Sequence, residues 1–248
     1  MRAVVLLALA GMGARNTFAQ SATTAPAPVL TLQLAPPAPP EGRPAVSAKA
    51  ATAYRRGVAA LHKGKNAHAE RDARRALRLA PSFAEAWALA ATASLAQRDF
   101  KSATQQAATA VRLAPGMEAA WILLATAENH RGQYAEAMRA LQHLPFTGND
   151  PWQADYQRAR AAAGLREGPA VLAYTNRAAL AAPQAFAPLH LLRASAMADQ
   201  GEYKNAAEEL TLYIQLAGDR SPDHAALQQE VARLRALTQP KSADLAGK

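Results

Sequence analysis

The six histidines are the first candidates for catalytic or metal-binding chemistry in this sequence, because the chain contains no cysteine. Without thiols there is no disulfide framework, no cysteine-ligated metal and no thiol nucleophile. The six histidines are scattered, and none stands in the His-Glu-x-x-His arrangement that places two metal ligands on one helical face. His62 and His68 are six positions apart across an expected turn, which makes only a weak metal site.

Two other catalytic patterns are missing from the sequence. There is no Gly-x-Ser-x-Gly elbow of the kind that presents a serine nucleophile, and no glycine-rich phosphate loop follows a strand. We therefore expect no catalytic residue, no cofactor and no metal, and we expect a protein that binds rather than reacts. A metal found in the purified protein would reopen the question of an enzyme.

The composition indicates helices in close contact. Of the 248 residues, 50% are hydrophobic but only 6% are aromatic, so alanine and leucine supply most of the apolar side chains. The 28 Lys and Arg exceed the 19 Asp and Glu, which gives a formal charge of +9. Small apolar side chains allow helix backbones to approach closely, while the positive balance favours acidic partners.

The first residues have the three-part form of a secretory signal. Met1 and Arg2 precede an apolar stretch that begins at Ala3, and small residues lead to an expected cleavage after Ala19. The stretch is far shorter than the roughly 20 residues that span a bilayer. We expect residues 1–19 to be a signal peptide and the mature chain to be periplasmic or secreted, with no transmembrane segment. The alternative is an uncleaved amphipathic start of a cytosolic protein.

Residues 20–46 are predicted to form a disordered linker. Seven prolines fall between Ser21 and Pro44, and proline fixes φ and lacks an amide hydrogen, which favours an extended chain. Within the linker, residues 29–34 alternate as a strand would. This segment either docks on a partner or on the folded body, or is merely an apolar patch in a tether; a lone strand is unstable, which favours the tether.

From about Ser47 onward the apolar residues recur at helical spacing, and a longer period is superimposed on it. Several residue types return 34 positions later, as Ala69 and Ala103, Ala76 and Ala110, Leu79 and Leu113, Pro81 and Pro115, and Trp87 and Trp121. This pattern resembles the tetratricopeptide repeat family, whose unit is an antiparallel helix pair closed by a proline.

The resemblance implies an all-α, right-handed superhelical solenoid. About five helix pairs are expected over residues 47–221, followed by a C-terminal capping helix over 222–238 and a flexible tail over 239–248. The large aromatic residues are expected to pack in the core between pairs. A loop around Pro145–Pro151 is expected to set the fourth unit out of phase with the strict period, and it either redirects the superhelix or is neutral.

In the resembling family the first helix of each pair lines a concave groove that holds a peptide or a partner helix. Carried over to this sequence, the expected partner-binding residues are Tyr54, Val58, Ile122, Thr126, Asn129, Tyr156 and Arg160. Among these we favour Tyr156, Arg160 and Asn129, on the expectation that exposed aromatic and arginine side chains dominate interfaces. The Lys and Asn clamp with which one subgroup grips terminal carboxylates is missing.

The first unit carries a local excess of positive charge, which offers a second binding hypothesis. Its arginines include a cluster expected on one helix, namely Arg71, Arg74, Arg75 and Arg78. This cluster would attract an anionic surface such as lipid or lipopolysaccharide head groups, or an acidic partner. Nucleic acid is not expected, because no recognised reader motif or stacking platform is present.

The sequence therefore predicts a non-enzymatic scaffold or adaptor in a bacterial cell envelope that binds a peptide or partner helix in its concave groove. The alternative is a protein that binds a polyanion (lipid, lipopolysaccharide or nucleic acid) through its basic first repeat.

Overall fold

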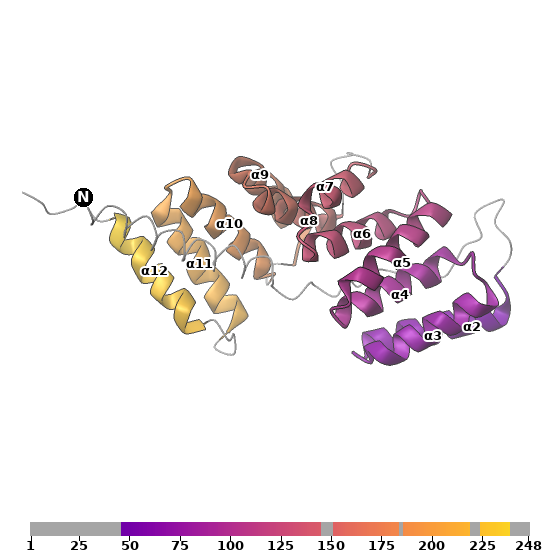
Figure 1. Ribbon diagram of the computed structural model, residues 1–248. Coiled ribbons are helices and arrows are strands. Elements are labelled where there is room, and N and C mark those ends of the chain that lie inside the picture. Colours follow the sequence, from indigo (N-terminus) through magenta and orange to yellow (C-terminus); the bar gives the residue numbers. More distant parts are fainter. Residues whose placement is uncertain (1–45, 145–150, 184–185, 219–223, 239–248) are drawn as a thin grey trace, which may run out of the picture. The chain divides into compact units, whose positions relative to one another are not determined.

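The computed structural model describes residues 46–144, 151–183, 186–218 and 224–238, and within these ranges every regular element is a helix (Figure 1). The helices belong to two units that divide inside α8, between Gln157 and Arg158. None of the helices in the described ranges has the length and apolar character needed to cross a bilayer. The all-α, repeat-built fold class predicted from the sequence is confirmed.

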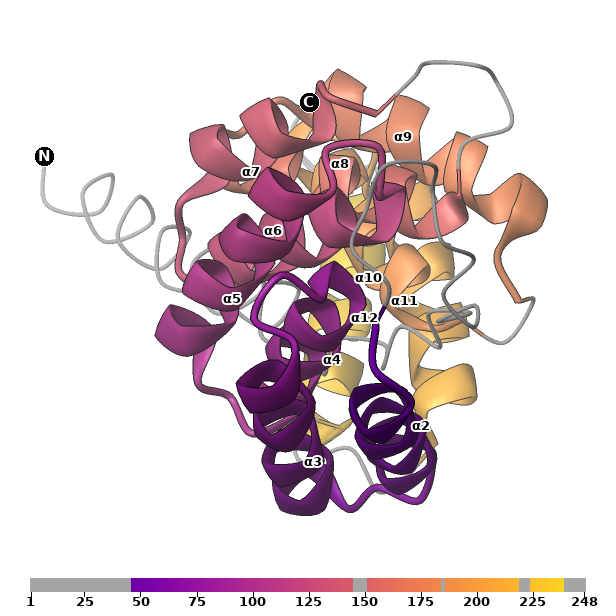
Figure 2. The same ribbon diagram turned by 90° about the vertical axis from the view of Figure 1, so that its right-hand side faces the viewer.

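The first unit along the chain is built from antiparallel helix pairs. Its helices are α2 (Ala48–His62), α3 (Asn66–Leu79), α4 (Ala84–Ala96), α5 (Phe100–Leu113), α6 (Glu118–His130), α7 (Tyr134–Leu141) and the start of α8 (Trp152–Gly164). Within a pair α2 packs on α3, α4 on α5 and α6 on α7 (Figure 1, Figure 2). Successive pairs join through α3 with α4 and α5 with α6, and the first helices also meet, α2 with α4 and α4 with α6.

The second unit is also built from helices that pack on their neighbours along the chain. After α8 come α9 (Gly168–Ala181), α10 (Pro188–Asp199), α11 (Tyr203–Ala217) and α12 (His224–Thr238). In this unit α9 packs on α10, α10 on α11 and α11 on α12. Helix α12 occupies the residues for which a last helix was predicted. Its Leu227, Val231 and Leu234 are buried, whereas Leu237 is 50% exposed.

The turn inside each pair has one backbone form. One residue adopts a positive φ of 62° to 82°, and the next amide donates a 2.9 Å hydrogen bond to the carbonyl five residues back, as in a Schellman motif. The positive-φ residues are Gly64, Arg98, Gly132, Arg166 and Gly201. The first four are spaced by 34 residues, so the turn carries the period even where arginine replaces the glycine that this backbone favours.

The fourth repeat keeps the 34-residue phase, so the predicted offset is wrong. Helices α4, α6 and α8 begin at Ala84, Glu118 and Trp152, each 34 residues after the last. The irregularity is absorbed by α7 instead, which has 8 residues where its counterpart α5 has 14. Proline at 145 cannot continue the helix, and shortening the second helix leaves the next first helix in register.

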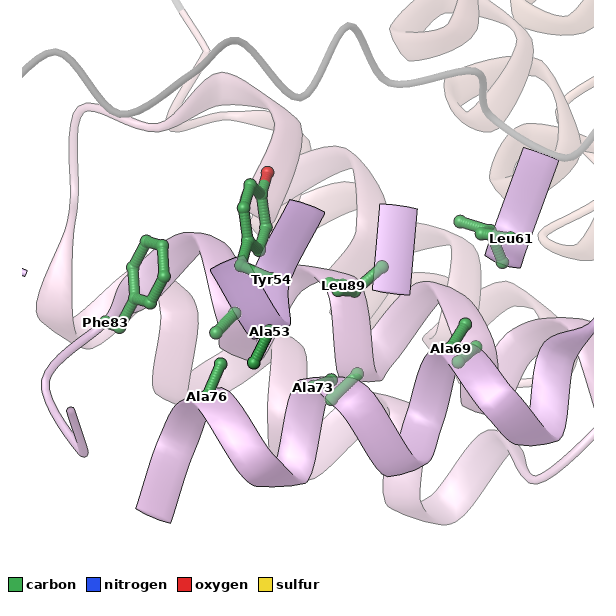
Figure 3. Close-up of a cluster of buried hydrophobic side chains, with 11 residues drawn as sticks. Ala53, Tyr54, Leu61, Ala69, Ala73, Ala76, Phe83 and Leu89 are labelled. Carbon is green, nitrogen blue, oxygen red and sulfur yellow. The ribbon is translucent and has the colours of Figure 1, made fainter. Parts of the chain in front are cut away.

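Small side chains bring the first two pairs into contact. Ala69, Ala73 and Ala76 of α3 are fully buried against α2, and Gly57 of α2 lies so close to α4 that an added Cβ would stand 2.6 Å from Leu89 Cδ2. In Figure 3 Tyr54 and Phe83 close one end of this cluster, with ring centroids 5.0 Å apart. Alanine-rich helices thus pack at short range, with few aromatic rings filling the remaining space.

The repeat tryptophans are less buried than predicted. Trp87 and Trp121 are only partly buried, as are Phe100, Tyr134 and Tyr203. The indole Nε1 of Trp87 donates a 2.8 Å hydrogen bond to the carbonyl oxygen of Pro81, at the end of the previous repeat. These rings cover the junctions between repeats rather than occupying the centre of the core.

Several predicted segments lie outside the described residues. These are the signal peptide at 1–19, almost all of the linker at 20–46 with its alternating stretch at 29–34, most of the loop after Leu144, and the tail at 239–248. Where the described chain begins, the Ser47 hydroxyl accepts a 3.2 Å hydrogen bond from the Ala50 amide and caps α2.

Candidate partner-binding surfaces

On the first helix of the array, the predicted groove residues divide between interior and surface. Tyr54 is 2% exposed and packs on Phe83, while Val58 is half-buried; the neighbouring His62, which was not among the predicted contacts, is exposed. Burial raises the pKa of the Tyr54 hydroxyl well above its usual range, and the nearby Glu85 carboxylate raises it further. Tyr54 is therefore a neutral core ring, and Val58 with His62 forms the accessible part of this face.

The predicted groove residues of α6 are also interior. Ile122, Thr126 and Asn129 are each at most 3% exposed. The Thr126 hydroxyl donates to the Ile122 carbonyl at 2.7 Å, which satisfies it within its own helix. Asn129 Nδ2 donates to the backbone oxygen of Gln157 at 2.9 Å and to its side-chain oxygen at 3.0 Å. Asn129 thus links α6 to α8, a role that the sequence did not reveal.

The expectation that Tyr156 and Arg160 are exposed is wrong, because both side chains are 0% exposed. They belong to a run of consecutive buried residues in α8 that includes Asp155 and Arg158. Helix α4 is similar, since its residues from Ala88 to Ser94 are all buried. A helix buried over consecutive positions is covered on all sides. Of the seven predicted partner contacts, Val58 is the one that a partner can touch directly.

The predicted anion-binding arginines are all on the surface. Arg71, Arg74, Arg75 and Arg78 are exposed along one face of α3, opposite the face on which its alanines are buried. Spacings of three, four and seven residues place side chains on one helical face. This spacing therefore aligns the four arginines along α3.

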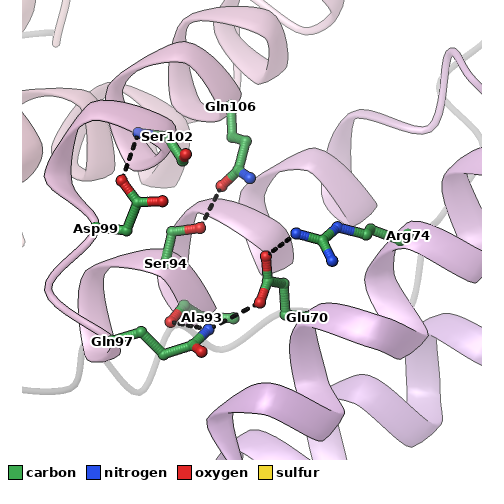
Figure 4. Close-up of polar contacts among 8 residues, drawn as sticks. All are labelled: Glu70, Arg74, Ala93, Ser94, Gln97, Asp99, Ser102 and Gln106. Carbon is green, nitrogen blue, oxygen red and sulfur yellow. Dashed lines mark hydrogen bonds and ion pairs between the residues drawn. The ribbon is translucent and has the colours of Figure 1, made fainter.

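One of these arginines is neutralised locally. The Arg74 guanidinium donates to the Glu70 carboxylate, whose other oxygen accepts a 3.0 Å hydrogen bond from Gln97 of α4 (Figure 4). No ion pair is recorded for Arg71, Arg75 or Arg78 within the described ranges. The cluster therefore offers three uncompensated charges rather than four.

Two of the arginines line a cavity of about 470 Å³ between the start of α2 and the end of α3. Lys49, Thr52 and Arg56 form the α2 side, and Arg75 and Arg78 form the α3 side. The apolar surface comes from Ala48, Ala53 and Leu79. Neither Lys49 nor Arg56 was predicted as a site residue. Their spacing of seven residues places both on one face of α2, but it does not show that this face lies beside Arg75.

The described residues gather no metal-binding set. Among them no three His, Asp or Glu side chains lie together as metal ligands would. His190 Nδ1 lies 2.7 Å from Glu209 Oε2, and Arg193 Nε lies 2.9 Å from Glu209 Oε1. The Glu209 carboxylate thereby joins α11 to α10 through its two basic neighbours.

Comparison with known proteins agrees with the repeat architecture. Residues 94–163, which contain α5, α6 and α7 and most of α8, match the tetratricopeptide repeat family. No curated protein sequence matches the chain.

Solved structures share the fold at low sequence identity. PilW, described as a widely conserved type IV pilus biogenesis factor, superposes with a TM-score of 0.67 at 16% identity, covering 78% of this chain and 89% of that one. MamA from Desulfovibrio magneticus RS-1 gives 0.59 at 18% identity, covering 71% and 99%. TTC0263, a tetratricopeptide repeat protein of Thermus thermophilus, gives 0.55 at 18% identity, covering 75% and 99%.

The family match falls on helices whose starts and turns recur every 34 residues in this chain. The chain therefore has the fold of tetratricopeptide repeat proteins, and residues 94–163 match that family.

Proposed function

We propose that this protein is a non-enzymatic adaptor of a bacterial cell envelope that holds a peptide or helix of a partner protein on the accessible face of α2, the first helix of its described repeats. Tetratricopeptide repeat folds are in general scaffolds for protein–protein interaction. The observation that carries the proposal is the 34-residue recurrence of helix pairs, because stacked repeats build an extended surface rather than an enclosed site.

Direct contact is assigned to the accessible part of that face. Val58 and His62 lie one helical turn apart on α2, half-buried and exposed respectively. Tyr54 and the predicted residues of α6 and α8 lie behind the surface, where they fix the helices that present it. The half-buried Val58 supplies apolar area, and the neighbouring Arg55, which is exposed, supplies a polar rim.

The envelope location rests on the signal-like first 19 residues. It is supported by the likeness to a structure described as a pilus biogenesis factor. Intact-mass analysis of the chain recovered from its native cells tests it: export predicts an N-terminus at Gln20. A chain that keeps Met1 and Arg2 and remains in the cytosolic fraction would contradict the envelope assignment.

Affinity capture from envelope extract tests the binding face. The test variant is Val58→Arg with His62→Glu, and the control is Gln105→Arg with Ala108→Glu on the exposed face of α5. Each pair adds one positive and one negative charge at neutral pH. A protein partner retained by the parent and the control but lost by the test variant supports the proposal. Recovery of no protein, or equal loss in both variants, contradicts it.

The second candidate function is polyanion binding through the basic first repeat. It is favoured by the exposure of Arg71, Arg75 and Arg78 along α3, although the pairing of Arg74 with Glu70 weakens it. Binding driven by phosphate charge falls steeply with salt concentration. Retention of anionic vesicles that disappears in the triple Arg71→Gln, Arg75→Gln, Arg78→Gln variant would support this function.

A further inference from the structure

The groove between α2 and α3 is the surface against which no earlier described repeat packs, and its residues differ from their counterparts one repeat later. Adding 34 to Lys49, Thr52 and Arg56 gives Phe83, Ala86 and Ala90. Those three are 2%, 0% and 1% exposed, and Phe83 packs on Tyr54 of the preceding repeat. Where an internal repeat uses apolar residues to receive its predecessor, the first repeat presents a lysine, a threonine and an arginine.

The groove combines cations with an apolar floor. Lys49 and Arg56 come from α2, and Arg75 and Arg78 from the antiparallel α3, so positive charge stands on both sides of the cavity. Between them lie alanine methyl groups and Leu79, which is 46% exposed. A cavity of about 470 Å³ has room for side chains to enter.

The positive charge of this groove is not balanced within the described ranges. Some exposed arginines outside the groove pair with a glutamate three residues away, as Arg131 does with Glu128 and Arg233 with Glu230. None of the cavity-lining residues is acidic, and no ion pair is recorded for its four cations. A surface that only caps the end of the array would carry both positive and negative side chains. Four like charges, by contrast, repel one another and are stabilised by an anion.

We propose that this groove binds an acidic peptide segment of a partner protein, in which an apolar side chain enters the cavity and carboxylates on either side meet the cations. This inference rests on the proposed role as a protein-binding scaffold, but it places a second contact away from the Val58 face. The guanidinium group of arginine binds a carboxylate with two parallel hydrogen bonds, which fixes the orientation of the bound carboxylate.

The apolar floor favours a peptide over a phosphate polymer or a membrane. Phosphate attraction needs only accessible cations, and the ridge of Arg71 and Arg75 would serve it without a cavity. A recessed floor with an exposed leucine gains stability only when an apolar group covers it. Together, the two features match a segment that alternates acidic and apolar residues.

Fluorescence anisotropy with the full chain tests this directly. The probe is a short labelled peptide with glutamates on both sides of a central leucine. Matched peptides replace the glutamates with glutamines or the leucine with serine. The parent should bind the first peptide at least about tenfold more tightly than either matched peptide, because each removes one of the two contributions.

Variants then place the peptide on the groove. Arg75→Gln with Arg78→Gln should weaken binding about tenfold. The control, Lys101→Gln with Arg112→Gln, removes the same charge from α5 and should leave it unchanged. All four side chains are exposed, and Arg112 is the counterpart of Arg78 one repeat later, so folding is not expected to differ. Circular dichroism checks that it does not.

Three results would overturn the inference. Equal weakening in the control would show a general charge effect, and equal binding of the serine peptide would remove the role of the floor. If the parent bound phosphatidylglycerol vesicles or single-stranded DNA more tightly than the acidic peptide, and the groove variant lost this binding, the site would be assigned to polyanions instead. Loss of the extract partner by the Val58 variant while the peptide still binds would separate this site from the proposed face.

Discussion

The indole Nε1 of Trp121 donates a 2.8 Å hydrogen bond to the carbonyl oxygen of Pro115, the second residue after α5 of the previous repeat. The same ring stacks on His143, with centroids 4.0 Å apart and planes 12° from parallel. One partly buried side chain therefore ties the end of α5 to α6 and covers the residues that follow α7. The equivalent hydrogen bond from Trp87 to Pro81 shows that the same contact joins the preceding pair of repeats.

Replacing this ring should destabilise the array in two steps. Trp121→Phe keeps a ring against His143 but loses the bond to Pro115, and it should lower the free energy of unfolding by about 1 kcal/mol. Trp121→Ala also loses the packing and should lower it by about 2–4 kcal/mol. Urea unfolding followed by circular dichroism measures both. Equal stability of the parent and the alanine variant would refute the junction role.

The positive-φ turns predict opposite effects of two glycine exchanges. Gly132 has φ 74°, so Gly132→Ala should cost about 1 kcal/mol. Arg166 has φ 63°, and Arg166→Gly should remove strain of about 1 kcal/mol, although added freedom in the unfolded chain offsets part of it. Gly116, which has no positive φ and open space around its Cα, provides Gly116→Ala as a control. A loss in the control equal to that of Gly132→Ala would contradict the interpretation.

The close approach of α2 to α4 predicts a cost for one added methyl group. In Gly57→Ala the Cβ would stand 2.6 Å from Leu89 Cδ2 and 3.2 Å from the Ala69 carbonyl oxygen. We expect a loss of about 1–3 kcal/mol. A double-mutant cycle with Leu89→Ala checks the cause, since removing the leucine should relieve part of the clash. Strict additivity would show that Leu89 is not the group that Gly57 accommodates.

The buried carboxyl group of Glu128 predicts a pH effect. Desolvation raises the pKa of Glu128 above its usual value, with Arg131 opposing and Glu136 adding to the shift. Because the folded state then holds its proton more tightly than the unfolded state, ionisation costs stability as the pH rises through the carboxyl range. Glu128→Gln should therefore gain stability relative to the parent between mildly acidic and neutral pH. A stability gap that closes or reverses with rising pH would contradict this sign.

Much of the fold followed from the sequence because its causes are periodic. Alanine at Ala69 and Ala103, and proline after each second helix, repeat with the helix pairs that they pack and terminate. The phase prediction was wrong because the break in the helical pattern after Leu144 corresponds to a shorter α7 and not to a displaced α8. A local irregularity does not reveal which neighbour absorbs it.

The site residues were harder to predict because exposure depends on what covers a helix. The periodicity places Tyr156 and Arg160 on the first-helix face, but it does not report that the face is buried at these positions. The arginines of α3 could be predicted because a local excess of charge is visible in the sequence without knowing which helices pack nearby. Lys49 is noticed only when α2 and α3 are seen to lie side by side.

The most direct test of the central claim is site-specific photo-crosslinking in the native cell. p-Benzoylphenylalanine replaces Val58 in one variant and the exposed Gln105 of α5 in another. A protein-binding adaptor predicts one defined crosslinked protein at position 58 that is absent at position 105. No protein crosslink at position 58, or the same products at both positions, would contradict the account.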